Sequence, residues 1–391
     1  MQTNNLDLTP VIASRLPHIG TTIFSLMSAL AAENNAVNLG QGFPDFDCDP
    51  ALIDAVTAAM KKGLNQYALM PGVPVLRAAI AQKIASLYGY QYDQNSEITV
   101  TAGATQALLT AIQCCVHAGD EVIVIEPAFD SYLPAITLAG GKPVCVQMEL
   151  NEAGYTVPWD KVAAAITTRT RLIMINSPHN PTGSVLLLQD LQKLADIVRG
   201  TDILLLSDEV YEHMVYDGNR HESVCRHPEL AARAFVVSSF GKTYHVTGWK
   251  VGYVAAPASL TAEFRKVHQF SLFAVNAPMQ HAIANYMDNA RPYIELPDFY
   301  QRKRDQFRSG LQATRFKLLP ADGTYFQCVD YREISDLPEI EFSQWLTREI
   351  GVAAIPVSAF YEQPRNSGIV RFCFAKKEET LKAALARLAK A

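Results

Sequence analysis

The chain has 391 residues, which is long for one domain when domains average about 150 residues. Hydrophobic residues make up 49% and charged residues 19%, so the composition excludes a disordered chain and can fill a large core. The 34 Lys and Arg against 39 Asp and Glu residues give a net charge of −5, without the basic block expected of a nucleic-acid-binding protein.

Targeting and redox signals point to a cytoplasmic protein. The N-terminal sequence lacks a basic stretch followed by an apolar one, so a secretory signal is not expected. The longest apolar runs, ILLL and VIVI, are far shorter than the roughly 18 residues that span a membrane. Seven cysteines form no CxxC pair, and the adjacent Cys114 and Cys115 fall in an apolar helical stretch. We therefore expect reduced thiols, no membrane association and no metal.

Short apolar runs recur between helical stretches along the first two thirds of the chain. Strands are predicted at 98–101, 121–126, 171–176, 203–209, 235–242 and 251–257. The runs are continuous rather than alternating, which suits strands that are buried on both faces of a mostly parallel sheet. Their alternation with helices predicts an α/β architecture.

The pattern changes after about residue 290. The stretch 291–312 is predicted as one long charged helix, and the remainder reads as an α+β unit that ends in a helix, EETLKAALARLAKA. We predict an N-terminal segment at 1–46 that joins a small C-terminal domain at 291–391, with a large domain at 47–290 between them.

The ends of the first and third predicted strands carry polar turns. Gly103, Ala104 and Thr105 follow the first strand and open a helix, whose free N–H groups would favour a phosphate. A tight turn with Thr105 near the cap explains the same residues. The third strand ends in SPHNPTG, where two prolines and a glycine could present Asn180 at the sheet edge. A purely structural turn is equally consistent with that motif.

The next two strands end in charged residues. Asp208, Glu209 and Tyr211 follow the fourth strand, where acidic residues also serve as helix caps. Lys242 follows the fifth strand, and a lysine at a buried strand end favours a functional role because lysine is seldom buried without one. A phosphate-binding turn, an asparagine, a carboxylate and a lysine together match what pyridoxal phosphate requires of a protein.

Motifs of a known family run nearly end to end along the chain. They are NLGQGFPDF (38–46), NQYALMPG (65–72), TVTAGATQAL (99–108), NSPHNPTG (176–183), SDEVYEH (207–213), SSFGKTYHVTGWKVGY (238–253) and VRFCFAKKE (370–378). With these motifs the sequence resembles the fold-type I, class I/II aminotransferases. It is most similar to their methionine aminotransferase branch, which is related to kynurenine aminotransferase and glutamine transaminase K.

The resemblance implies a pyridoxal 5'-phosphate site in a large domain with a mostly parallel sheet between helices, beside a smaller α+β domain. Lys242 corresponds to the lysine that binds the cofactor covalently and moves the substrate proton. Asp208 corresponds to the partner of the pyridine nitrogen, and Tyr211 and Asn180 to the contacts of the phenolic oxygen. Phe129 corresponds to the aromatic residue that stacks on the cofactor ring.

The resemblance also implies which residues bind the cofactor phosphate and the substrate carboxylate. Residues of this chain that would hold the phosphate are Gly103, Ala104, Thr105, Ser239 and Lys250, with Tyr67 reaching over from the neighbouring subunit of a homodimer that shares its active sites. Lys250 stands where many members carry arginine. Arg371 would bind the substrate α-carboxylate, assisted by Asn180 and the backbone of Gly42; its planar, permanently charged fork suits that task.

The implied reaction is ping-pong transamination of an L-amino acid to its 2-oxo acid. The mouth of the site is expected to draw on uncharged residues, Ile19, Phe24, Tyr132 and Phe273, and no second arginine is identifiable for a distal carboxylate. An apolar or aromatic side chain is therefore expected, with methionine favoured. A kynurenine- or glutamine-type aminotransferase and a cysteine S-conjugate β-lyase are the alternatives with the same site. A transcription regulator with an aminotransferase-like domain is disfavoured, because only about forty residues precede the family motifs.

Overall fold

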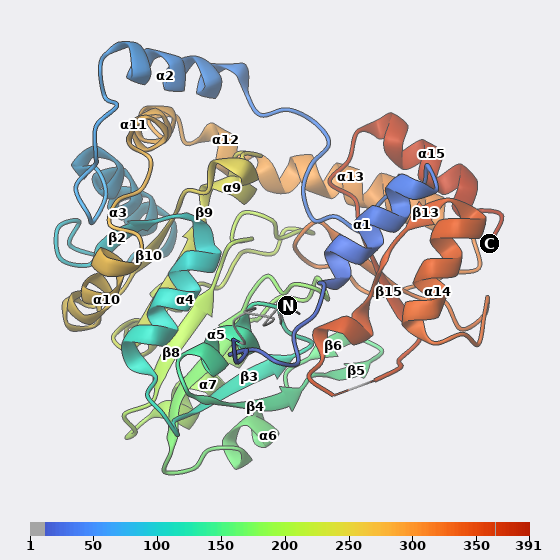
Figure 1. Cartoon of the computed structure of the whole chain (residues 1–391), viewed down its shortest axis with the longest axis horizontal. Coiled ribbons are helices and arrows are strands. Elements are labelled where there is room, and N and C mark those ends of the chain that lie inside the picture. The colour runs from blue at the N-terminus through green and yellow to red at the C-terminus, as the bar shows by residue number, and fades with distance from the viewer. Residues whose placement is uncertain (1–11, 364) are drawn as a thin grey trace, which may run out of the picture.

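A seven-stranded sheet forms the centre of the larger part of the molecule (Figure 1). The computed structural model describes residues 12–363 and 365–391. The strand order is β2-β10-β9-β8-β7-β3-β4, and β10 is antiparallel to both of its neighbours while the other pairs are parallel. The strands are β2 (Ile98–Thr101), β3 (Glu121–Glu126), β4 (Lys142–Gln147), β7 (Thr170–Asn176), β8 (Leu204–Asp208), β9 (Ala234–Ser239) and β10 (Gly252–Ala255).

Each of the six predicted apolar runs corresponds to a strand of this sheet; β2 and β3 have the predicted bounds, and the other four strands have shifted ends. The fourth strand stops at Asp208, and the fifth stops at Ser239 where the helix α9 (Phe240–Thr243) begins. The seventh strand, β4, was not predicted. It lies at the sheet edge, where most of its residues are exposed or half-buried, so its sequence KPVCVQ lacks the continuous apolar character of the inner strands.

Helices cover both faces of the large sheet, which explains the continuous apolar runs. On β7, Ile173 and Ile175 pack with the helices of one face, whereas Leu172 and Met174 pack with those of the other. The first face carries α3 (Pro74–Tyr88), α7 (Leu188–Val198) and α11 (Ala277–Tyr286). The second carries α4 (Gly103–Cys115), α5 (Tyr132–Leu138) and α10 (Ala258–Ser271).

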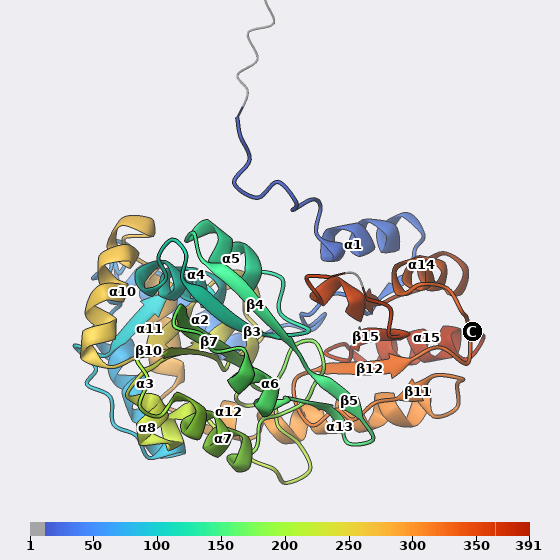
Figure 2. The ribbon, with the colours of Figure 1, turned by 90° about the horizontal axis from the view of Figure 1, so that it is seen from below.

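A four-stranded antiparallel sheet organises the smaller body, with strand order β11-β12-β15-β14 (Figure 2). Its strands are β11 (Lys317–Leu318), β12 (Phe326–Asp330), β14 (Ile355–Pro356) and β15 (Ile369–Cys373). They share a core with α13 (Leu296–Leu311), α14 (Glu339–Trp345) and α15 (Glu378–Leu388). The helix predicted at 291–312 is therefore divided into α12 (Arg291–Ile294) and α13. The break precedes Pro297, which lacks the N–H needed to continue a helix.

The segment before residue 46 lies against the smaller body. The strand β1 (Val37–Asn38) pairs in parallel with β13 (Val352–Ala353). The helix α1 (Ile23–Glu33) lies beside both strands, and Figure 1 shows it next to β13. The domain boundaries at 46/47 and 290/291 stay predictions.

The remaining elements are α2 (Pro50–Lys61), β5 (Glu149–Asn151), β6 (Gly154–Thr156), α6 (Trp159–Ala164), α8 (Pro228–Ala231) and short helical turns at 224–226, 247–249, 346–350 and 357–360.

The seven cysteines are all free, and Cys115 is buried inside α4 with Cys114 half-buried beside it. Across 12–363 and 365–391, no helix has both the length and the apolar character to cross a membrane.

Candidate active site

A cavity of about 180 Å³ lies where the carboxyl ends of β7, β8 and β9 meet the start of α4. Ligands of open α/β sheets bind at this position, because loops from neighbouring parallel strands converge there. The cavity is lined by Gly103, Ala104, Thr105, Leu108, Phe129, Asn176, Asn180, Asp208, Val210, Tyr211, Ser239, Lys242, Thr247 and Lys250. Most of the cofactor-binding residues that the sequence predicts are therefore brought together.

The N-terminus of α4 forms one end of the cavity. Among the described residues no side chain caps this helix, so its first N–H groups remain available for an anion. Gly103 has a φ of +73°, and a Cβ atom there would lie 3.5 Å from the Lys250 Nζ, which shows how close the lysine comes to the helix start. Ser239 adds a hydroxyl at the same cavity. Helix N–H groups, a hydroxyl and an ammonium group suit a phosphate.

Asp208 lies at the end of β8, and its carboxylate is buried. The Tyr132 hydroxyl donates a hydrogen bond to its Oδ2 at 2.7 Å, and the Val210 N–H donates to Oδ1 at 3.2 Å. Burial raises the pKa of Asp208 to about 6, although both hydrogen bonds act to lower it. A cationic group beside the carboxylate would favour its ionised form, as a protonated pyridine nitrogen would.

The structure corrects the expectation for Tyr132. We expected this side chain at the mouth of the site, but it is 3% exposed and its hydroxyl is bonded to Asp208. The reason is that Tyr132 is the first residue of α5, and that turn packs against the sheet. Tyr132 therefore supports the carboxylate rather than lining the side-chain pocket.

Lys242 lies in α9, which continues directly from β9. Its Nζ donates to the Gly42 carbonyl oxygen at 3.0 Å and to the Tyr325 hydroxyl at 2.8 Å. Nζ also lies 5.6 Å from the ring centre of Tyr211, whose own pKa is raised by burial. Burial lowers the pKa of Lys242 to about 8. A lysine amine that is easily neutralised can act as a base and as a nucleophile.

Arg371 lies on β15 and is fully buried. Its guanidinium donates to the Asn180 Oδ1 at 2.7 Å and to the Gly40 carbonyl oxygen at 3.1 Å, and stacks 3.8 Å from the ring centre of Phe326. Its Nε has no hydrogen-bond partner among the described residues, and no carboxylate there forms an ion pair with it. Burial lowers its pKa. A buried cation that is paired only with neutral groups suits an anionic ligand.

Gly42 and Ile19, which were predicted to bind substrate, and Tyr67, which was predicted to bind the cofactor phosphate, do not line the first cavity. Gly42 presents its carbonyl oxygen to Lys242. Ile19 is 56% exposed and lines a second cavity of about 500 Å³, which shares Phe129 with the first. Tyr67 is 83% exposed and contacts Phe273 edge to face at 5.1 Å, outside the first cavity.

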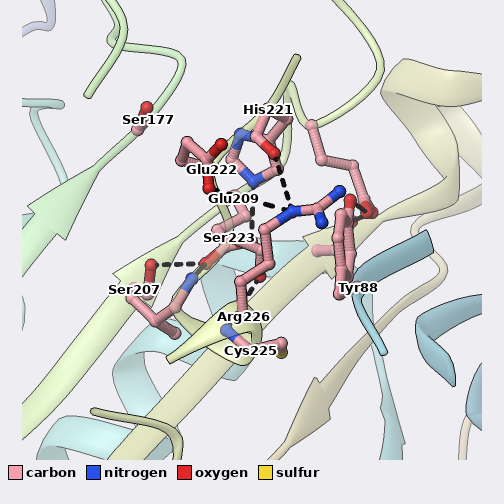
Figure 3. Close-up of polar contacts among 12 residues, drawn as sticks. Tyr88, Ser177, Ser207, Glu209, His221, Glu222, Ser223, Cys225 and Arg226 are labelled. Carbon is pink, nitrogen blue, oxygen red and sulfur yellow. Dashed lines mark hydrogen bonds and ion pairs between the residues drawn. The ribbon is translucent and has the colours of Figure 1, made fainter. Parts of the chain in front are cut away.

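Glu209 follows Asp208 and fixes the end of β8 to a neighbouring segment (Figure 3). Its carboxylate accepts hydrogen bonds from the Ser207 hydroxyl at 2.8 Å and the Val224 N–H at 3.1 Å, and contacts the His221 Nε2 at 2.8 Å. All of these partners are buried. Glu209 is therefore a structural residue that helps to hold Asp208 at the cavity.

Tyr325 was missed by the sequence analysis. It directly precedes β12 and lies in the smaller body, yet its hydroxyl contacts Lys242, 83 residues earlier in the chain. Nothing in the run GTYF distinguishes this tyrosine from an ordinary core residue. Only the packing of the two bodies brings it to the amine.

A lysine, a buried carboxylate and a phosphate-binding helix start at one sheet edge define a pyridoxal-phosphate site. A family model described as aminotransferase class I and II matches residues 34–388. The chain therefore belongs to the class I and II aminotransferases, which use pyridoxal phosphate. The predicted family, fold-type I architecture and cofactor are confirmed.

Three relatives place the chain within this family. It is 52% identical to the methionine aminotransferase of Escherichia coli over 96% of this chain and 97% of that protein. A crystal structure of an Escherichia coli protein with this function superposes with a TM-score of 0.95 at 50% identity, covering 98% of this chain and 100% of that one. The probable N-succinyldiaminopimelate aminotransferase of Mycobacterium tuberculosis is 39% identical, covering 96% and 97%. Kynurenine–oxoglutarate transaminase 1 of Mus musculus is 36% identical, covering 96% of each chain.

The phosphate end of the site yields a first prediction. A Cβ atom at Gly252 would lie 2.7 Å from the Ser238 carbonyl oxygen and 3.2 Å from the Ala104 nitrogen, so Gly252→Ala should displace the start of α4. We expect the dissociation constant of pyridoxal phosphate to rise about tenfold or more, since such overpacking costs about 1–3 kcal/mol. Absorbance titration of the cofactor-free protein measures this. Gly248→Ala is the control, because no atom of the described part of the chain lies within 4 Å of its Cβ position. Equal affinities of the two variants would contradict the prediction.

Proposed function

We propose that this aminotransferase converts an L-amino acid with an apolar or aromatic side chain to its 2-oxo acid, with methionine favoured. The observation that carries the proposal is the lining of the second cavity, which has no Lys or Arg among the described residues but includes Asp130 and Glu362. Apart from His18, a distal substrate carboxylate would find no basic group there, and the two acidic residues would repel it. The identity of 52% to a methionine aminotransferase supports the same substrate.

Each residue of the site would have its own role in the reaction. Arg371 and Asn180 bind and orient the substrate α-carboxylate, because the guanidinium is already held by the amide oxygen at 2.7 Å. Lys242 removes the α-proton at its Nζ and returns it. Asp208, supported by Tyr132, keeps the pyridine nitrogen protonated. Pyridoxal phosphate, when bound, supplies a ring that accepts the electrons left on the α-carbon.

Remaining cofactor contacts follow from the cavity lining. We propose that Gly103, Ala104, Thr105, Ser239 and Lys250 hold the phosphate, that Phe129 covers the ring, and that Tyr211 and Asn180 contact the phenolic oxygen. Ile19 and Phe24 would border the side chain of the substrate, since Ile19 lines the second cavity and the Phe24 ring lies 5.5 Å from the Arg371 guanidinium.

A homodimer with shared active sites belongs to the same proposal. Tyr67, Leu69 and Phe270 are 83%, 61% and 91% exposed, which is unusual for apolar side chains and fits a surface covered by a second copy. In a crystal structure the Tyr67 hydroxyl should approach the phosphate of the neighbouring subunit, and a contact within one chain would refute this. The free cysteines fit a cytoplasmic enzyme.

The substrate proposal is tested by the half-reaction without an acceptor. Adding L-methionine to the yellow holoenzyme should bleach the visible band, and kcat/KM for methionine should exceed that for L-aspartate by at least about tenfold. Aspartate that is used as efficiently as methionine would contradict the reading of the pocket. Release of pyruvate and ammonia from a cysteine S-conjugate without an oxo acid would instead reveal β-elimination.

Arg371→Lys tests the binding of the α-carboxylate. Lysine keeps the charge but cannot form two parallel hydrogen bonds, so one charge-assisted bond worth about 1.5–3 kcal/mol should be lost. We expect kcat/KM to fall about 10- to 150-fold for every amino acid donor. Steady-state kinetics with methionine and phenylalanine check this, with the exposed Arg348→Lys as the control. If kcat/KM fell for only one amino acid donor, Arg371 would instead contact the side chain of that donor.

A further inference from the structure

The Lys242 amine rests on two acceptors that come from distant parts of the chain. The Gly42 carbonyl oxygen lies at 3.0 Å and the Tyr325 hydroxyl oxygen at 2.8 Å from Nζ. The Tyr325 hydroxyl also donates to the same Gly42 carbonyl, so its proton is already used. Toward the lysine the hydroxyl therefore acts as an acceptor.

The position of the Tyr325 hydroxyl is fixed by its surroundings. The side chain is fully buried, and its ring packs edge to face against Tyr211 at 5.2 Å. In the turn before it, Thr324 has a φ of +64° and its N–H donates to the Met214 carbonyl at 2.9 Å. The Gly323 N–H donates to the Gly183 carbonyl at 2.8 Å. The turn is thus attached to the loops that carry Tyr211 and Asn180.

We propose that the Tyr325 hydroxyl and the Gly42 carbonyl form an amine cradle, which holds the Lys242 amine whenever this amine is not bound to the cofactor. A neutral lysine amine has two hydrogens and one lone pair. Because both hydrogens are bound by the cradle, the direction of the lone pair is set, and the base is oriented before substrate arrives. This inference rests on the proposed role of Lys242 as the base, and assigns Tyr325 as a positioning residue.

The cradle also influences the protonation of the amine. Both of its members accept hydrogen bonds, and acceptors favour the ammonium form over the neutral one. Burial acts in the opposite direction and lowers the pKa of Lys242 to about 8. The other titratable or charged groups near the amine are Asp208, Tyr211, Lys250, Arg371 and Cys373. Tyr325→Phe leaves all of these in place, so it should lower the pKa of Lys242 further.

Labelling of Lys242 tests the cradle without using activity. The full-length chain without cofactor is treated with an amine-acylating reagent across a pH series, and modification at Lys242 is followed by peptide mass spectrometry. For Tyr325→Phe we expect the pH midpoint of labelling to fall by about one to two units, the effect of one hydrogen bond to a charged group. A midpoint equal to that of the unaltered chain would overturn the proposal.

Tyr300→Phe is the matched control. Tyr300 is equally buried and its ring centre lies 5.7 Å from that of Tyr325, but its hydroxyl has no hydrogen-bond partner among the described residues. Its removal should leave the labelling midpoint unchanged. An equal shift in both variants would indicate a general effect of packing and would also overturn the cradle.

Kinetics of the holoenzyme provide the second measurement. In Tyr325→Phe, kcat should fall about 10- to 100-fold because the base is weaker and less well oriented. KM for L-methionine should stay within about threefold, since Arg371 and Asn180 are untouched. The acidic limb of the kcat–pH profile should move to lower pH together with the labelling midpoint. A raised KM with unchanged kcat would contradict the cradle, whereas an active Lys242→Ala would instead refute the proposed function.

Discussion

Lys242→Ala is expected to abolish transamination. The variant lacks the amine that would move the substrate proton, and a general base alone contributes about 10²–10⁴-fold to the rate. The visible absorbance of the lysine-bound cofactor should also be lost. Turnover with L-methionine and an oxo acid, followed by product formation, measures the first effect, and the spectrum after addition of pyridoxal phosphate measures the second.

The fold should survive this change. In the absence of the amine, the Tyr325 hydroxyl still donates to the Gly42 carbonyl, so no buried polar group of this pair loses its partner. Circular dichroism and thermal unfolding check that the variant is folded. Lys266→Ala is the matched control, because that lysine is exposed and forms its ion pair with the exposed Glu263. Transamination by Lys242→Ala at a rate near that of the control would remove the basis of the proposed mechanism.

Asp208→Asn should retain the cofactor, but its kcat should fall about 10²–10³-fold. This is the typical effect of removing one group that stabilises the charge developing in the transition state. Asparagine has nearly the same shape, and its amide oxygen can still accept the hydrogen bond that Tyr132 donates to Asp208. It lacks the negative charge that keeps the pyridine nitrogen protonated. The half-reaction with L-methionine, followed by stopped-flow absorbance, isolates this step.

A control for Asp208→Asn lies just before the same strand. Asp202 is exposed and precedes β8, at the end of the strand opposite the cavity, so Asp202→Asn should leave the half-reaction unchanged. Cofactor content is determined for both variants from absorbance after denaturation. If kcat of Asp208→Asn fell only a few-fold, the carboxylate would not be needed to keep the pyridine nitrogen protonated.

Much of the large domain follows from the local sequence. The strands β7 and β8 are continuous apolar runs because helices cover both sheet faces, and this pattern is visible without any structure. The carboxyl ends of neighbouring parallel strands meet at one edge, so polar residues after each strand are expected to converge. Asn180, Asp208 and Lys242 do line one cavity. The edge strand β4 escaped prediction because an edge position relaxes the apolar requirement.

By itself, then, the sequence determined the family, the cofactor and the residues that follow the strands, since each depends on local pattern or on motifs that are contiguous in the chain. The tertiary structure alone decided which side chains support them. Tyr132 lies on Asp208 rather than at the mouth, Arg371 bonds an asparagine 191 residues away, and Tyr325 joins Gly42, 283 residues away, at the Lys242 amine. Such contacts depend on how α5 packs on the sheet and how the two bodies meet, and a linear sequence carries no local signal of either.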